Sequence, residues 1–215
     1  MSGSAGAVQP GGERSRTGRP PLSERQKREL RAKVARAAVR LFAERGVSGT
    51  TGDAIARAVG ISSRTLWRHF PTKESCVRPF LDDSLEGVTA LLRSWPADVR
   101  LVDFLRGCYA AGLVAAPDED VLTVLALVHT EPSLRAVWLD VHEDALPVFA
   151  EILARRCGRS VDSLEVKVHA ATVNGALRAA VEHYERTTAP GAHSVERLFG
   201  CLDAALDAAA RGLPY

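Results

Sequence analysis

The sequence contains no apolar run that approaches the roughly 20 residues needed to span a bilayer. Its first 21 residues are rich in Gly, Ser, Pro and Arg, and they lack the apolar core of a signal peptide. We therefore expect a protein that does not enter a membrane and that works in the cytoplasm.

Cysteine is scarce, and its four positions lie far apart with no Cys-x-x-Cys pair: Cys76, Cys108, Cys157 and Cys201. Neither a zinc site nor a disulfide framework is indicated, and reduced thiols are the simplest interpretation.

The motifs of common enzymes are missing as well. There is no Gly-x-Ser-x-Gly elbow, no phosphate-binding glycine loop and no His-Glu-x-x-His pair. His142, Glu143 and Asp144 are consecutive, and neighbours on a helix point in different directions, so one metal ion does not easily take all three. We expect no enzyme, no metal site and no cofactor.

Alternating strand patterns are also absent, and we predict an all-α fold in which several prolines mark ends or bends. Pro79 is expected to kink or split one helix, and Pro147 to bend another. The expected helices span about residues 23–45, 73–93, 97–115, 118–130, 132–157, 160–186 and 194–212, besides two short ones between 50 and 70.

The most informative stretch runs from Thr50 to Glu74. Thr50 or Thr51 can cap a helix that ends at Gly60, and Ser62 can cap a second helix that ends before Pro71. Two short helices joined by a turn that contains glycine form the helix-turn-helix pattern.

The second of these helices is crowded with hydrogen-bond donors and carries no acid. Leu66 and Phe70 supply its inward face. Such a surface suits a polyanion, because Arg reads guanine edges and hydroxyl groups contact bases or phosphates. The donors are Ser63, Arg64, Thr65, Trp67, Arg68 and His69.

Charge is divided unevenly along the chain. Residues 1–75 hold 15 Lys and Arg against 6 Asp and Glu, a balance of +9, whereas residues 76–215 hold 13 against 20, a balance of −7. Only the first part is therefore expected to meet nucleic acid. Arg14, Arg16 and Arg19 either form an arm that enters the minor groove or belong to a solvated tail.

These residues resemble the N-terminal domain of TetR-family transcriptional regulators. The resemblance rests on Thr50-Thr51, Ile55-Ala56, Gly60-Ile61-Ser62, Thr65-Leu66, Arg68-His69-Phe70-Pro71 and Lys73-Glu74. It implies a homodimer on a double-stranded DNA operator, which a small-molecule effector releases. It implies base contacts from Ser63, Arg64 and Thr65 and phosphate contacts from Thr51, Trp67, His69 and Lys73. Ser62 and Arg68 complete the predicted set of DNA-binding residues. Trp67 stands where the family usually has Tyr, and Gly52 where a larger apolar residue is common.

The remainder of the chain should form a helical bundle with a ligand pocket. The segment from Leu125 to Arg135 and the alanine-rich tail resemble C-terminal domains of actinobacterial TetR regulators thought to sense acyl-CoA-like ligands, which makes a lipophilic effector one expectation. Polar or aromatic residues on apolar stripes are the candidate lining, although each also fits as a core residue: Tyr109, His129, Trp138, His142, Asn174 and Arg178.

The last two helices are rich in alanine, which lets helices approach closely. The family resemblance implies that they form the dimer interface; from the residues alone they are equally good core helices. The apolar residues assigned to this interface are Leu177, Val181, Leu198, Leu202 and Leu206.

We therefore predict an N-terminal arm (1–22), a helix-turn-helix domain (23–75) and a ligand-binding and dimerisation domain (76–215). The predicted function is a transcriptional repressor. An activator of the same fold, or a helical binding protein or enzyme without specific DNA binding, remains as an alternative.

Overall fold

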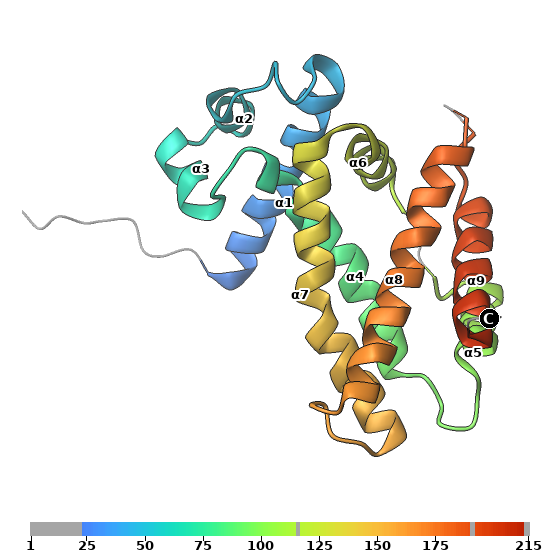
Figure 1. Cartoon of the computed structure of the whole chain (residues 1–215). Coiled ribbons are helices and arrows are strands. Elements are labelled where there is room, and N and C mark those ends of the chain that lie inside the picture. Colours follow the sequence, from blue (N-terminus) through green and yellow to red (C-terminus); the bar gives the residue numbers. More distant parts are fainter. Residues whose placement is uncertain (1–22, 115–116, 190–191, 213–215) are drawn as a thin grey trace, which may run out of the picture.

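The computed structural model describes residues 23–114, 117–189 and 192–212. These residues form helices and no strand, as predicted (Figure 1). The arginines of the expected N-terminal arm lie outside the described residues. The elements are α1 (Glu24–Arg45), α2 (Gly52–Val59), α3 (Ser63–His69), the 3-10 helix η1 (Glu74–Val77), α4 (Arg78–Arg93), α5 (Leu101–Ala110), α6 (Glu119–Thr130), α7 (Pro132–Cys157), α8 (Leu164–Thr187) and α9 (Val195–Arg211).

The ends of the first three helices are set by local capping. Ser23 and Gln26 form a complete capping box at the start of α1. Thr51 and Ser62 accept backbone N–H groups at the starts of α2 and α3, and Gly60 ends α2 in the left-handed conformation. The predicted helix-turn-helix is confirmed, and it occupies one end of the molecule together with α1 (Figure 1).

Two polar side chains fasten the turn between α1 and α2. The buried hydroxyl group of Thr50 lies within hydrogen-bond distance of the carbonyl oxygens of Leu41 and Gly46, at 3.1 and 2.9 Å. Lys73 Nζ donates to the carbonyl oxygens of Val47 and Thr50, at 2.6 and 2.9 Å. The start of η1 is thereby tied to the turn that leads into α2.

The predicted helix over residues 73–93 is split, because Pro79 is accommodated in the first turn of α4 and η1 precedes it. The other proline lies inside α7, which continues through Pro147. At the far end of the molecule α8 packs against both α7 and α9, and α5 packs against α9 (Figure 1).

The helix predicted over 97–115 is shorter than expected. Arg156 of α7 lies 3.5 Å from the ring centroid of Trp95 and donates to the carbonyl oxygens of Ala97 and Val99, at 3.0 and 2.7 Å. These contacts hold the segment before α5 outside a helix, and Gly112, with a φ of 69°, follows its end. A tertiary contact therefore decides where α5 begins.

One apolar core crosses the boundary predicted at residue 75. Ile55, Leu66 and Phe42 of the helix-turn-helix end belong to the same buried cluster as Val128 of α6 and Trp138 of α7. A second cluster joins α4, α5, α7, α8 and α9 around Phe149. The DNA-binding end is therefore packed directly onto α6 and α7.

A buried polar pair connects α7 and α8. Asn174 Nδ2 donates to the carbonyl oxygen of His142 at 3.1 Å, and Asn174 Oδ1 lies 2.7 Å from His142 Nδ1. Because the amide oxygen faces Nδ1, that ring nitrogen carries the proton and Nε2 is an acceptor. Burial lowers the pKa of His142 below its ordinary value of 6.5, and the charge of Arg178 lowers it further, whereas the hydrogen bond that His142 donates to Asn174 raises it.

Lys73→Met is expected to lower stability by about 2 kcal/mol, because it removes two hydrogen bonds from a charged donor. For a chain of this size the melting temperature should fall by about 4–8 °C. Lys167→Met is the matched control, since the Lys167 side chain is 60% exposed. A melting curve for Lys73→Met that coincides with the control would show that the tether contributes nothing.

The His142 shift predicts a stability that depends on pH. Because the folded pKa of His142 is lowered, the folded chain binds fewer protons than the unfolded chain. The stability gained from neutral His142 is therefore complete above about pH 6.5, and it is lost as the pH falls toward the lower folded pKa. The melting temperature should therefore drop between pH 7 and pH 5.5, and His142→Gln should drop less. Equal slopes for the two proteins in thermal melts would contradict this assignment.

Candidate nucleic-acid interface and ligand site

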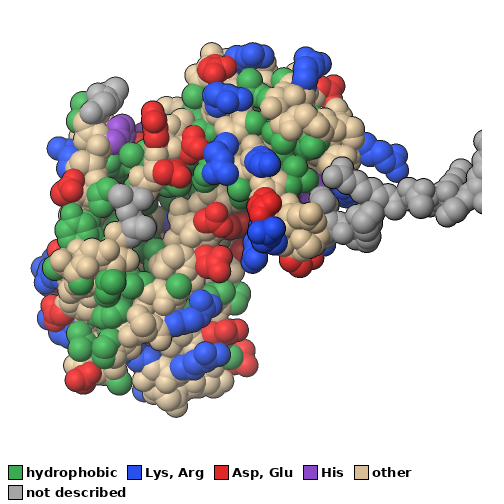
Figure 2. Space-filling model, turned by 180° about the vertical axis from the view of Figure 1, so that it is seen from behind, with side chains coloured by type: hydrophobic (Ala, Val, Ile, Leu, Met, Phe, Trp, Pro, Cys, Tyr) green, Lys and Arg blue, Asp and Glu red, His purple; other side chains and the backbone are tan. Residues whose placement is uncertain are grey.

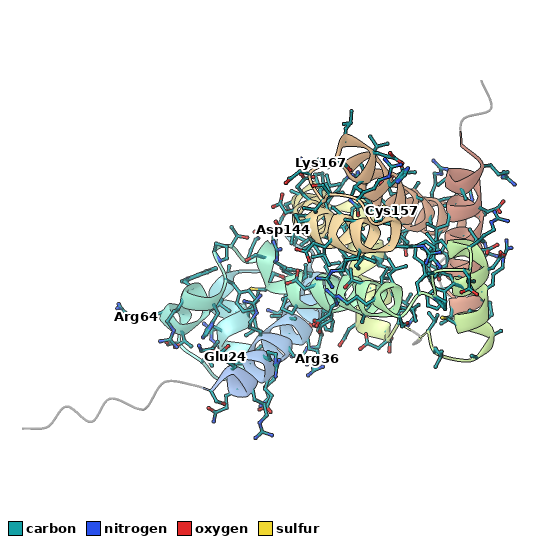
Figure 3. The ribbon with its side chains drawn as sticks, turned by 90° about the horizontal axis from the view of Figure 1, so that it is seen from below. Glu24, Arg36, Arg64, Asp144, Cys157 and Lys167 are labelled. Carbon is teal, nitrogen blue, oxygen red and sulfur yellow. The ribbon has the colours of Figure 1, made fainter. Side chains whose placement is uncertain are left out.

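The surface of α3 presents three side chains to solvent. Arg64, Trp67 and Arg68 are exposed, while Leu66 is fully buried beneath them and Phe70 follows it into the core. Figure 3 shows Arg64 extending away from the body of the molecule. Several Lys and Arg side chains also lie on the surface of the end that carries α1–α3, among uncharged groups (Figure 2). This face is suited to phosphate and base contacts.

Two of the predicted base-reading residues are engaged inside the helix-turn-helix. Ser63 Oγ donates to Asp53 Oδ1, which joins the first residues of α3 and α2. Thr65 Oγ1 lies 2.9 Å from Ser62 Oγ, which also caps α3. The contact between Asp53 and Ser63 was not predicted from the sequence, because it joins two different helices.

The predicted phosphate contacts divide into two kinds. Thr51 is exposed beside the N-terminus of α2, and its hydroxyl oxygen accepts the N–H of Ala54 at 3.1 Å. Lys73 is instead engaged with two backbone carbonyls, and its Nζ atom also lies 3.8 Å from Glu74 Oε1. Sequence spacing alone did not reveal that internal role.

His69 is partly buried at the end of α3. Its Nε2 atom is buried and has no hydrogen-bond partner in the structure. Burial lowers the pKa of His69 below its ordinary value, and the positive charges of Arg68, Arg31 and Lys27 lower it further. The imidazole is therefore mainly neutral near pH 7.

Four of the six residues predicted for a ligand pocket come together between α7 and α8. The Trp138 ring meets His142 edge-on with centroids 4.7 Å apart, and the guanidinium carbon of Arg178 lies 5.6 Å from the Trp138 ring centroid. Arg178 Nε is buried without a hydrogen-bond partner in the structure. Together with the pair of His142 and Asn174, the cluster of these four residues offers both hydrogen-bond donors and an acceptor.

The cluster has a neighbour that the sequence reasoning missed. Arg135 Nη2 donates to Glu182 Oε1 at 2.7 Å, and the Arg135 guanidinium carbon lies 5.7 Å from the Trp138 ring centroid. Arg135 precedes Trp138 by three positions and Glu182 follows Arg178 by four. Helical spacing therefore places Arg135 on the same face of α7 as Trp138, and Glu182 on the same face of α8 as Arg178.

The other two predicted pocket residues lie elsewhere. Tyr109 of α5 stacks on Phe199 of α9, with ring centroids 3.9 Å apart. His129 is exposed near the end of α6. Tyr109 lies on α5 and His129 on α6, whereas the other four predicted pocket residues lie on α7 and α8.

The residues predicted for the dimer interface are turned largely inward. Leu177 and Leu206 are 8% and 5% exposed and belong to the core around Phe149. Leu202 packs against that core, Val181 packs against the other cluster, and Leu198 is partly buried. Leu177 and Leu206 therefore have little surface left for a partner, because the same apolar periodicity fits a core and an interface.

The outer faces of α8 and α9 carry small side chains instead. An open groove of about 760 Å³ runs between them, lined by small residues such as Ala179, Gly200 and Ala204 and by charged ones such as Arg186 and Arg197. Further toward the start of α8 the exposed face continues through Gly175, Val168 and Leu164, the last being 77% exposed.

None of the helices in residues 23–114, 117–189 and 192–212 combines the length and the apolarity that crossing a bilayer requires. In the same part of the chain, His, Cys, Asp and Glu side chains nowhere form a group of three or more suited to a metal ion.

Comparison with known proteins identifies the family. The bacterial regulatory proteins of the tetR family match residues 34–78, and the MftR C-terminal domain matches residues 108–214. The transcriptional regulator TcmR of Streptomyces glaucescens is 30% identical over 157 residues, which cover 69% of this chain and 70% of that protein. The transcriptional repressor KstR2 of Rhodococcus jostii is 45% identical over 69 residues, which are 30% of this chain and 34% of that protein.

A solved structure supports the fold. The Thermus thermophilus TetR-family repressor FadR, crystallised with lauroyl-CoA, aligns with a TM-score of 0.55 over 86% of this chain and 95% of its own, at 22% identity. The helix-turn-helix, its exposed basic face and these matches agree. The chain therefore belongs to the TetR family of bacterial regulatory proteins and is a DNA-binding transcriptional regulator.

Proposed function

We propose that the protein is a repressor that binds a near-palindromic operator as a homodimer and is released by a small lipophilic effector. Two copies of α3 would enter successive major grooves about 34–36 Å apart. The single observation that carries this proposal is the exposed face of α3, with Arg64, Trp67 and Arg68 directed outward.

The contacts with DNA would come from several elements. Arg64 is the principal base-reading candidate, because its guanidinium group is exposed and matches the two acceptors of guanine. Trp67, Arg68 and Thr51 are proposed to contact the phosphate backbone. Ser62, Ser63, Thr65, His69 and Lys73 would support or share these contacts.

The outer faces of α8 and α9 are the proposed dimer interface. A Cβ atom added at Gly175 or Gly200 would have no heavy atom of the described chain within 4 Å, so the surface there is open. Small residues allow a second pair of helices to approach closely. The interface is proposed to use Leu164, Val168, Gly175, Ala179, Gly200 and Ala204 in place of the inward leucines.

The effector site is proposed at the group formed by Trp138, His142, Asn174 and Arg178. A buried donor on Arg178 and an acceptor on His142 suit a ligand with oxygen atoms at one end of an apolar body. A TetR-family fold that was crystallised with lauroyl-CoA supports an acyl thioester as one class of effector. The effector would have to prefer the released state of the dimer, because equal affinity for both states shifts nothing.

The decisive experiment is a titration of the purified protein against its own upstream DNA, with a scrambled duplex as the control, at 50 and 200 mM salt. We expect binding to the operator about a thousandfold tighter than binding to the scramble. Affinity for both duplexes should fall steeply with salt, because phosphate contacts release counterions. If the upstream DNA binds no better than the scramble, and a selection from genome fragments yields no preferred sequence, the proposal is wrong.

In the same assay Arg64→Ala should lose about 1–3 kcal/mol of discrimination at the base that it reads, with a smaller effect on the scramble. Arg155→Ala is the matched control, because Arg155 is exposed near the end of α7, at the other end of the molecule. Equal losses for Arg64→Ala on both duplexes would remove Arg64 from the base-reading role.

Gly175→Leu tests the dimer interface. The protomer has open space at this position, so the variant should keep its helical content while the larger side chain separates the two α8 helices. Light scattering should then give a monomer near 23.1 kDa, and operator binding should fall with it. Gly107→Leu, on the exposed part of α5, should remain dimeric. A dimeric Gly175→Leu protein would place the interface elsewhere.

A further inference from the structure

The first residue of α2 lies directly under the indole ring of α3. A Cβ atom added at Gly52 would lie 2.1 Å from Trp67 Cζ2 and 2.2 Å from Trp67 Cη2. Atoms cannot approach this closely without a shift of one group. The space that any side chain at position 52 would occupy is therefore filled by the indole of Trp67.

The need for glycine here is one of space and not of backbone conformation. Gly52 does not have a positive φ, and it is the first residue of α2. Other residues adopt that conformation readily, and glycine is a poor choice inside a helix. The ring contact is the feature that demands it.

The contact joins the two helices that must hold a fixed geometry on DNA. Trp67 lies in the middle of α3, between Arg64 and Arg68, and Gly52 begins α2 beside its cap Thr51. Trp67 remains 45% exposed although its outer ring carbons are wedged against Gly52. Below it, the buried Leu66 and Ile55 close the same junction from the core side.

We propose that Gly52 and Trp67 form a size-matched pair in which Trp67 is a positioning residue for the reading face of α3. The indole sets the separation of α3 from the N-terminus of α2, and Gly52 supplies the room for it. Trp67 in place of the usual Tyr, and Gly52 in place of a larger apolar residue, are then two parts of one feature. This inference rests on the proposed role of α3 in operator binding.

The test is a double-mutant cycle with wild type, Gly52→Ala, Trp67→Tyr and the double variant. Operator affinity, the ratio of operator to scramble affinity and the melting temperature are measured for each protein. Gly107→Ala is the matched control, because a Cβ atom there meets no heavy atom of the described chain within 4 Å. The control should bind like wild type and melt no lower.

We expect Gly52→Ala to lose operator affinity by about tenfold or more, since its new methyl group displaces the indole and α3 with it. Trp67→Tyr replaces the fused ring pair by a single ring and makes room for that methyl group. The double variant should therefore bind about as tightly as Trp67→Tyr alone, and it should recover selectivity for the operator. This recovery distinguishes positioning from a general loss of stability.

Losses that simply add in the double variant, or wild-type binding by Gly52→Ala, would overturn the pairing. If Gly52→Ala does not fold, recovery of folding in the double variant still supports the pairing, and failure of both to fold contradicts it. A wild-type protein that selects no duplex would contradict the proposed function itself. Selective wild-type binding with additive variants would contradict the pairing alone.

Discussion

The rest of the structure depends on an apolar core that the helix-turn-helix shares with α6 and α7. Ile55 and Leu66, which hold α2 to α3, lie in the same buried cluster as Val128 and Trp138. A helix pair as short as α2 and α3 is too small to bury much apolar surface by itself. Its geometry is therefore maintained by contacts with the domain that is proposed to bind the effector.

Trp138 occupies the point where this core meets the polar group between α7 and α8. Its side chain is 3% exposed, and its ring contacts His142 and lies near the guanidinium groups of Arg135 and Arg178. A ligand that moved these cations would disturb a residue packed in the core of the DNA-binding end. Packed cores respond to such a change by moving between discrete arrangements.

Local chemistry made much of the fold predictable, and tertiary contacts account for what was missed. Caps such as Thr51, Gly60 and Ser62 act within one turn, so sequence alone located α2 and α3. The start of α5 depends on Arg156, which lies more than 50 positions away. Leu177 was assigned to an interface because a helix buried on one side looks the same whether its own chain or a partner covers it.

The helices α4 and α7 are fastened to each other at two distant points. Arg78, at the start of α4, pairs with Asp144 of α7, and Arg156 of α7 holds Trp95 just beyond the end of α4. Sliding one helix along the other would break both attachments. These contacts tie α7 to both ends of α4, so a displacement of α7 would be passed to α4 and to the helix-turn-helix that precedes it.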